Sequence, residues 1–135
     1  MQKITTFLWY DGKAKEAAEF YCSLFKNAKV INASPLIVNF EIEGQRFMAL
    51  NGGPQFKFTE AASLFVDCES QEEVDRLWKS LTADGGEESM CGWLKDKYGL
   101  SWQIIPRRLM ELMGDKDQAK AQRVMQAMLK MRKIE

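Results

Sequence analysis

The expected order of strands and helices repeats once along this chain, and that repeat limits the folds it can adopt. The first copy opens with ITTFLWY (4–10), whose β-branched and aromatic residues are typical of a strand. Apolar residues at helical spacing follow in KAKEAAEFYCSLF (13–25). Three further strands are then expected, at residues 29–32, 36–44 and 46–51.

The second copy opens with the strand SLFVDC (63–68), which carries an aspartate near its end as the first strand does. Ser70 and Glu73 match a capping box, in which Glu73 would return to the Ser70 backbone N–H. Strands are expected within 88–96 and 100–105. The helix that begins at this capping box places its apolar residues on one stripe: Val74, Leu77, Trp78 and Leu81.

Two local matches support the repeat. Asp11 and Asp67 lie 56 residues apart, and GQRFMAL (44–50) is similar to GLSWQII (99–105), 55 residues later. Their nearly equal offsets predict two β-α-β-β-β units, and so an α+β fold.

The last 29 residues, 107–135, differ from both copies. RRLMELM (107–113) predicts a short helix, and Asp117 can cap a final helix over QAKAQRVMQAMLKMRK (118–133). This helix could bind varied partners through its methionines, or it could pack on its own domain or a twin subunit. The second interpretation is favoured because apolar stripes usually mean burial. The stripe contains Ala121, Val124, Met125, Met128, Leu129 and Met131.

Composition limits the class of protein. The 135 residues suffice for one domain, and 46% of them are hydrophobic while 28% are charged, as in soluble globular proteins. Nineteen acidic and nineteen basic side chains cancel, so attraction to nucleic acid or to a membrane surface is not expected. Apolar runs too short to span a bilayer, no leader pattern and three widely spaced cysteines predict a cytoplasmic protein with reduced thiols.

The chain contains no histidine, which excludes Ser–His and Cys–His catalysis by its own side chains. Cys91 could be an activated thiol, but a small buried hydrophobe is the favoured interpretation. Glu41, Glu43 and Glu60 could act as general bases if partly buried. Glu41 and Glu43 are expected on one face of a strand, where most such pairs face water. Whether the chain catalyses a reaction is left open.

Four segments resemble one known family. They are FLWYDGKAKEAAEFYCSLF (7–25), FMALNGGPQFKF (47–58), CGWLKDKYGLSWQIIP (91–106) and KAQRVMQAMLKM (120–131). Together they resemble the PhnB-like branch of the vicinal oxygen chelate superfamily, which includes glyoxalase and bleomycin-resistance proteins. The resemblance implies α+β architecture with two β-α-β-β-β modules, each a half-barrel-like mixed sheet around a ligand cavity, plus C-terminal helices.

The resemblance also implies a division of the chain. A single glyoxalase/bleomycin-resistance-like domain is expected over 1–135, with module one at about 3–51 and module two at about 61–106. The linker is 52–60 and the helical tail 107–135. In NGGPQFKFTE (51–60), Gly52 and Gly53 permit unusual backbone angles and Pro54 stiffens the chain after it, so this stretch is interpreted first as a hinge.

Superfamily chemistry normally rests on a divalent metal held by His, Glu or Gln from the first and last strands of each module. The first-strand positions fall between Ile4 and Thr6 and near Ala61, beside Glu60, and the last-strand positions fall at Met48 and Gln103. Only Gln103 is a convincing donor, so neither a metal nor another cofactor is predicted, although weak binding through Glu60 or Gln103 is left open. Members of this branch have often been labelled demethylubiquinone methyltransferases, but this chain has no G-x-G-x-x-G run for a nucleoside cofactor.

Aromatic and amide side chains provide the candidates for a ligand site, because pockets combine aromatic walls with a few polar groups. Core packing is the default for each tryptophan, and Gln55 could donate a hydrogen bond from the linker. The predicted ligand-binding residues are Trp9, Asn51, Gln55, Trp93 and Gln103.

The favoured hypothesis is a metal-free protein that binds a small organic molecule of unknown identity. The alternatives are an enzyme of the superfamily, with or without a metal, and a purely structural dimeric module. A homodimer is expected because a half-barrel exposes an open sheet edge and an apolar face. The glycine-rich hinge would make exchange of modules between chains easy, and whether exchange occurs is left open.

Overall fold

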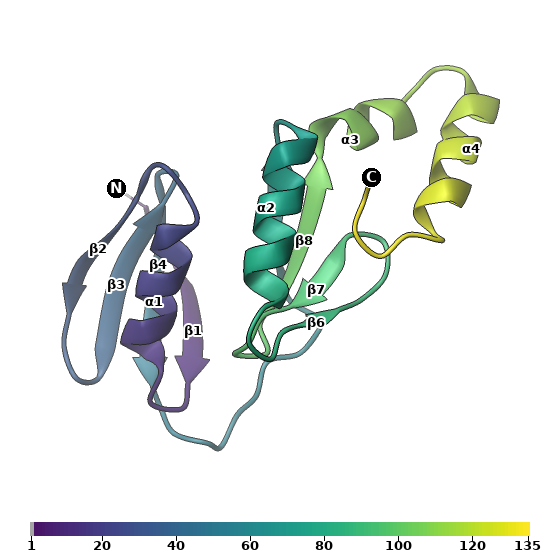
Figure 1. Ribbon diagram of the computed structural model, residues 1–135. Coiled ribbons are helices and arrows are strands. Elements are labelled where there is room, and N and C mark those ends of the chain that lie inside the picture. Colours follow the sequence, from purple (N-terminus) through teal and green to yellow (C-terminus); the bar gives the residue numbers. More distant parts are fainter. Residues whose placement is uncertain (1) are drawn as a thin grey trace. The chain divides into compact units, whose positions relative to one another are not determined.

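The structure is a computed structural model that describes residues 2–135. The chain divides between Phe58 and Thr59 into two compact units, an N-terminal and a C-terminal unit (Figure 1). Each unit has its own sheet, whose strands all come from that unit.

The N-terminal unit is a four-stranded mixed sheet with one helix. Its strands are β1 (Thr6–Tyr10), β2 (Ala28–Ala33), β3 (Ile37–Ile42) and β4 (Gln45–Asn51), and its helix is α1 (Ala14–Ser23). The strands lie in the order β1-β4-β3-β2, with β1 parallel to β4 and the other pairs antiparallel. Alternate strand residues are buried on the side of α1: Leu8, Tyr10, Val38, Phe40, Ile42, Phe47 and Ala49.

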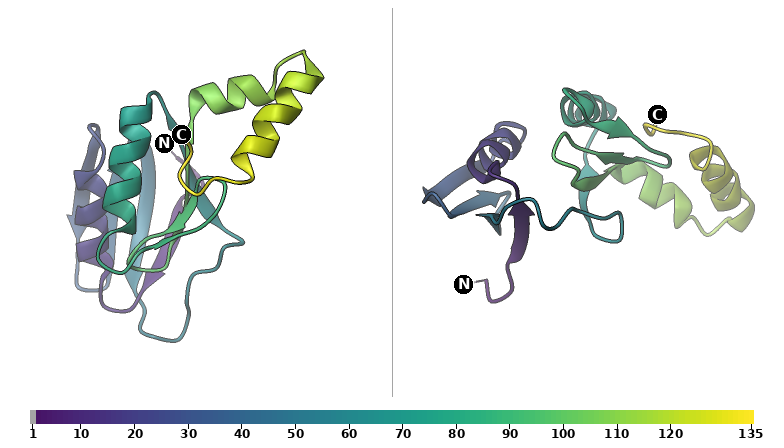
Figure 2. Two further views of the ribbon diagram at one scale, coloured as in Figure 1. Left: turned by 45° about the vertical axis from the view of Figure 1, so that its right-hand side comes forward. Right: turned by 90° about the horizontal axis from the view of Figure 1, so that it is seen from below.

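The C-terminal unit repeats this topology. Its sheet contains β5 (Ser63–Cys68), β6 (Glu87–Glu88), β7 (Trp93–Lys95) and β8 (Ser101–Pro106), in the order β5-β8-β7-β6 with β5 parallel to β8. Helix α2 (Gln71–Thr82) lies on one face of the sheet, as α1 does in its own unit (Figure 2). The α+β class, with two open mixed sheets of β-α-β-β-β order and helices at the C-terminus, is therefore confirmed.

The strand registers test the two sequence matches. The 55-residue offset holds for the last strands, since Phe47 and Trp102 are both buried and Ala49 and Ile104 are both fully buried. The aspartate match does not hold. Tyr10 pairs with Asn51 and Cys68 pairs with Pro106, so β1 and β5 correspond at an offset of 58, not 56. Asp67 lies inside β5, whereas Asp11 follows the end of β1.

Helix α2 begins at the predicted capping box, with one difference. The Glu73 N–H donates to Ser70 Oγ at 3.2 Å, as expected. The Glu73 carboxylate, however, accepts from the backbone N–H of Glu69 at 2.8 Å and not from that of Ser70. The predicted stripe is confirmed, because its four residues are all buried: Val74, Leu77, Trp78 and Leu81.

Two predicted elements differ most from their expected lengths. The single strand expected within 88–96 is divided into β6 and β7, because Cys91 and Gly92 both take positive φ angles, 60° and 84°, that interrupt a strand. The last helix, α4 (Gln118–Met128), ends five residues before Lys133. It ends there because the chain after it pairs with the 91–92 turn.

The tail otherwise follows the sequence pattern. Helix α3 spans Arg107–Met113, and Asp117 caps α4 by accepting from the N–H groups of Ala119 and Lys120 at 3.1 and 3.3 Å. Within residues 2–135, none of the helices is both long and apolar enough to cross a bilayer.

Candidate functional site

One row of side chains crosses the sheet of the C-terminal unit on the face turned away from α2. Phe65 in β5 and Trp93 in β7 both pair with Gln103 in the central strand β8. Directly paired residues share a face, and the buried Leu94 and Trp102 occupy the other one. The phenyl ring of Phe65 is half exposed, at 50%, while Trp93 and Gln103 are half-buried. The row thus presents two aromatic rings on either side of one amide.

Polar groups adjoin this row. The Gln103 Nε2 atom donates to Ser63 Oγ at 3.0 Å, which leaves the amide oxygen of Gln103 as an acceptor. Lys95 forms an ion pair with Glu60. The hydrogen bond from Lys95 lowers the pKa of the Glu60 carboxyl, which makes Glu60 a weaker base.

Two predicted ligand-binding residues of the N-terminal unit, Trp9 and Asn51, form hydrogen bonds with backbone groups of the same unit. The Trp9 Nε1 atom donates to the Gly53 carbonyl at 2.9 Å, and the Trp9 ring contacts Phe56 edge-on at 4.8 Å. A Cβ atom on Gly52 would lie 2.4 Å from the Trp9 ring, so glycine is required for this close approach. Trp9 therefore holds the start of the linker against β1.

Asn51 is also occupied by backbone groups. Its Oδ1 accepts from the Ala14 N–H at 2.8 Å at the start of α1, and its Nδ2 donates to the Pro35 carbonyl at 3.0 Å. Gln55 lies exposed in the turn after Pro54. The five predicted ligand-binding residues thus form no single cluster within either unit: Trp93 and Gln103 are neighbours, whereas Trp9 and Asn51 lie on opposite faces of the other sheet.

Two of the three thiols, those of Cys22 and Cys68, are partly or fully shielded from solvent. Burial raises the pKa of the Cys68 thiol to about 12 and raises that of Cys22, so both are poorer nucleophiles than a free cysteine. Cys91 is half-buried, and its N–H donates to the Met131 carbonyl at 2.8 Å. The expectation that Glu41 and Glu43 share a strand face is wrong, because β3 ends at Ile42 and Glu43 lies in the following turn with a φ of 49°.

Comparison with known proteins identifies the family. The family described as 3-demethylubiquinone-9 3-methyltransferase matches residues 2–105. A solved structure described as a putative 3-demethylubiquinone-9 3-methyltransferase, PhnB protein, from Bacillus cereus is 37% identical, with 78% of this chain and 99% of that chain covered and a TM-score of 0.71. This chain belongs to the PhnB-like family. No functionally curated protein matches it.

More distant structures share the fold of this PhnB-like chain. A glyoxalase/bleomycin resistance protein from Albidiferax ferrireducens is 15% identical, with 75% of this chain and 95% of that chain covered and a TM-score of 0.56. The fosfomycin resistance protein FosX from Listeria monocytogenes, solved with Mn(II) and sulfate, is 19% identical, with 76% and 88% covered and a TM-score of 0.55. These likenesses show that the chain shares its fold with a glyoxalase/bleomycin resistance protein and a fosfomycin resistance protein.

A divalent metal does not fit the corresponding positions of the PhnB-like chain. Ile4 and Ala61 precede β1 and β5, and the residues paired with Met48 and Gln103 on the first strands are Phe7 and Phe65, which carry no donor atom. Among residues 2–135, no three His, Cys, Asp or Glu side chains gather in a way that could hold a metal ion. Of Ile4, Met48, Ala61 and Gln103, only Gln103 carries an oxygen donor in its side chain.

Sequence reasoning missed Asp96, which is a buried carboxylate at the β7–β8 turn. Its Oδ1 accepts from the N–H groups of Tyr98 and Leu100 at 2.9 and 3.0 Å, and its Oδ2 accepts from Trp102 Nε1 at 3.0 Å. The side chain therefore fixes the turn beside the Trp93–Gln103 row. The available signal was the D-K-Y-G sequence, in which an aspartate three residues before a glycine is typical of a turn.

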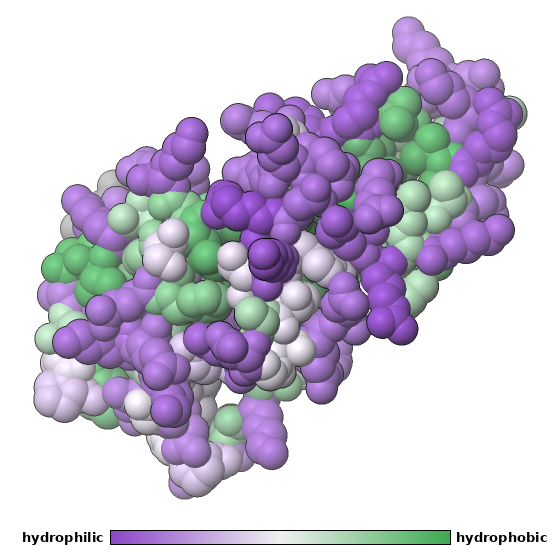
Figure 3. Space-filling model, in the orientation of Figure 1, coloured by the Kyte–Doolittle hydropathy of each residue, from purple (hydrophilic) through white to green (hydrophobic). Residues whose placement is uncertain are grey.

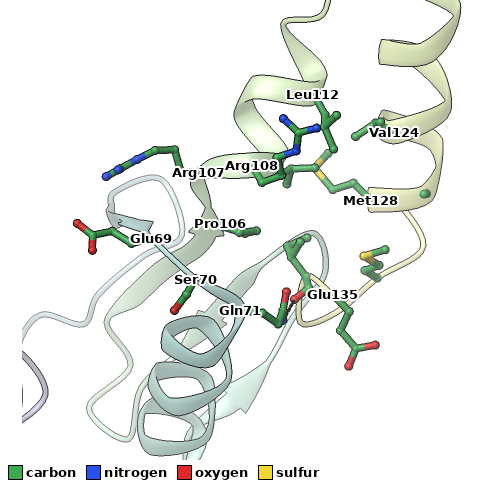
Figure 4. A pocket seen from close by; sticks show the side chains of 14 residues that line it. Glu69, Ser70, Gln71, Pro106, Arg107, Arg108, Leu112, Val124, Met128 and Glu135 are labelled. Carbon is green, nitrogen blue, oxygen red and sulfur yellow. Dashed lines mark hydrogen bonds between the residues drawn. The ribbon is translucent and has the colours of Figure 1, made fainter.

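A pocket of about 520 Å³ lies in the C-terminal unit, at the ends of β8 and α2 and between the tail helices (Figure 4). None of the five predicted ligand-binding residues lines this pocket. Most of its walls come instead from α3, α4 and the residues after α4.

Proposed function

We propose that this PhnB-like protein binds a small organic molecule on the sheet face of its C-terminal unit, through the row Phe65, Gln103 and Trp93, without a divalent metal. The observation that carries the proposal is the row itself, in which two accessible aromatic rings flank an amide whose oxygen can accept a hydrogen bond. Aromatic walls with a few fixed polar groups are typical of small-molecule sites.

The names of the distant relatives are consistent with a small-molecule function. One is named a bleomycin resistance protein and another a fosfomycin resistance protein, and both names refer to small organic molecules. The second was solved with Mn(II), whereas this chain places Phe7 and Phe65 opposite the last-strand positions. The lack of a donor atom in the Phe7 and Phe65 side chains supports binding without a metal.

The family description favours one alternative, an enzyme of the superfamily. Transfer of a methyl group from a nucleoside cofactor has no support in the motifs, because the chain contains no G-x-G-x-x-G run between a strand and a helix. An enzyme would need its acid–base group from Glu60 or another carboxylate, and the ion pair with Lys95 makes Glu60 a weaker base.

The proposal is tested by fluorine NMR on protein labelled with 5-fluorotryptophan, using a set of small aromatic fragments. The resonance of Trp93, assigned from Trp93→Phe, is expected to shift with at least one fragment. The resonance of Trp78, which lies on the buried face of α2 and donates to Glu88 Oε1 at 2.6 Å, serves as the internal control and stays fixed. Gln103→Ala should weaken such binding about tenfold through loss of one hydrogen bond, and Gln55→Ala should not.

Addition of Mn(II) to the same sample tests the metal-free part. Because a bound paramagnetic ion broadens nearby resonances, we expect no broadening of Trp93 beyond that of Trp78. Saturable broadening of Trp93 that Gln103→Ala removes would favour the metal-dependent enzyme instead. Fragments that shift Trp93 and Trp78 together, or that shift neither, would contradict a site at the row.

A further inference from the structure

The pocket in the C-terminal unit is built mainly by the tail. The family match ends at residue 105, whereas most of the residues that line the pocket lie at or after Pro106. Figure 4 shows Leu112, Val124 and Met128 facing one another from α3 and α4. In the space-filling view, apolar residues are visible at the end of this unit where α3 and α4 lie (Figure 3). The main apolar lining residues are Leu109, Leu112, Val124, Met128, Met131 and Ile134.

The walls of the pocket are anchored to the sheet at both ends of the tail. Helix α3 continues directly from β8, and Leu109 is buried against Ile105 and Ile134. After α4 the chain returns, and the N–H groups of Cys91 and Gly92 donate to the carbonyls of Met131 and Arg132 at 2.8 Å each. Helix α4, which has no buried residue of its own, is thus held over the pocket by its flanking segments.

Two further contacts hold the end of the tail against α2. The Gln71 Nε2 atom, at the start of α2, donates to the Ile134 carbonyl at 2.8 Å. Lys133 forms an ion pair with Asp75 at 2.9 Å. The opening between α3 and α4 is therefore a defined hollow with fixed ends and not a gap beside a free tail.

The charges at the rim do not select a charged ligand. Two arginines, Arg107 and Arg108, and two glutamates, Glu69 and Glu135, give no net charge. Arg107 already donates to Asp67 at 3.0 and 3.1 Å, and Arg108 pairs with Glu111 at 3.2 Å. The interior in contrast is apolar and contains two thioethers, which adapt to varied shapes.

We propose that this pocket is a second binding site, for an uncharged and largely apolar organic molecule of drug-like size. A volume of about 520 Å³ falls in the range of small-molecule sites, and a neutral rim around apolar walls matches a neutral ligand. The site is separate from the Phe65, Gln103 and Trp93 row.

The test uses the full chain and the uncharged fluorescent probe N-phenyl-1-naphthylamine. We expect saturable binding of one probe per chain with a blue-shifted emission. Val124→Trp places a large side chain in the pocket and should weaken binding at least about tenfold, because it fills the volume that the probe occupies. Met125→Trp is the matched control, since Met125 is 43% exposed and does not line the pocket, and it should leave binding within about twofold.

Two further variants keep the outcome decisive. Ala127→Trp fills the same wall from an exposed position and should reproduce the loss of probe binding. Circular dichroism checks that both variants are folded. Gln103→Ala should not alter probe binding, which separates this site from the proposed function. Failure to saturate, equal loss in Met125→Trp, or unchanged affinity in both Val124→Trp and Ala127→Trp would overturn the proposal.

Discussion

At the scale of single residues, the buried Asp96 carboxylate sets the geometry of the β7–β8 turn. It accepts hydrogen bonds from the backbone N–H groups of Tyr98 and Leu100 and from Trp102 Nε1. Asp96→Ala should lower the free energy of unfolding by about 3 kcal/mol, because buried donors lose their partner. Guanidinium unfolding measures the change, and the exposed Asp11→Ala, as control, should cost less than about 0.5 kcal/mol. Similar losses in both variants would show that Asp96 has no special role.

Residue roles were the least predictable part of the sequence. Asn51 and Trp9 are predicted ligand-binding residues, and the sequence did not reveal that Asn51 caps α1 or that Trp9 Nε1 donates to the Gly53 carbonyl. The role of Asp96 was not predictable, because its hydrogen-bond partners come from the turn that it stabilises and from Trp102, six residues later in β8. Such roles depend on which backbone groups a fold leaves unpaired, and periodicity carries no information about them.

At the scale of elements, the return of the tail onto the 91–92 turn depends on Gly92. A Cβ at Gly92 would lie 2.6 Å from Ile105 Cδ1 and 3.1 Å from Ile134 Cγ1. Gly99 has a similar φ, 88° against 84°, but open space around it. Gly92→Ala should therefore cost at least about 1 kcal/mol more than Gly99→Ala, because both strain the backbone and only the first displaces core atoms.

Hydrogen exchange extends this comparison from stability to structure. Amides of α4 should exchange faster in Gly92→Ala than in Gly99→Ala, because the segment that anchors this helix is loosened. Equal exchange in the two variants would mean that α4 is held by contacts other than those at Met131–Ile134. Urea or guanidinium unfolding of the two variants supplies the free-energy difference itself.

The elements themselves were largely predictable, for an identifiable reason. Strand SLFVDC and helix RRLMELM match β5 and α3 in their bounds, since composition and hydrophobic period are local properties. The early end of α4 was not predictable, because apolar periodicity continues through Met131 while the backbone leaves the helix to pair with Cys91 and Gly92. The two tertiary hydrogen bonds to the 91–92 turn therefore outweigh the helical periodicity of the sequence at Met131.

At the scale of the whole molecule, the repeat was the strongest signal, and the 55-residue offset of β4 and β8 has a physical basis. Both strands are central in their sheets, so burial on the helix side constrains alternate residues such as Phe47 and Trp102. The first strands lie at sheet edges, where only one neighbour fixes the register. The match between Asp11 and Asp67 near the ends of these strands therefore predicted an offset that the strand pairing does not support.

Assembly is the remaining prediction at this scale, and we expect a homodimer. Large apolar side chains remain exposed in each unit, with Phe7 at 49%, Phe65 at 50% and Leu129 at 50%. Removal of the chain after Gly114 would be a poor test of whether the tail contributes, because it also deletes the buried Ile134. Met125→Glu with Leu129→Glu is sharper, since these exposed residues lie one helical turn apart, in α4 and at its C-cap, and have no role in the core.

Sedimentation equilibrium at micromolar concentration measures the outcome. The unaltered protein should show twice the 15.5 kDa mass of one chain, and the double variant should dissociate at least about tenfold more readily because two charges would be buried at the interface. Gln122→Glu with Gln126→Glu adds the same charges at exposed polar positions of α4 and should leave the dimer intact. A mass near one chain for the unaltered protein would refute the dimer. An intact dimer in both variants would instead exclude the Met125 and Leu129 face of α4 from the interface and direct the search to the exposed sheet residues Phe7 and Phe65.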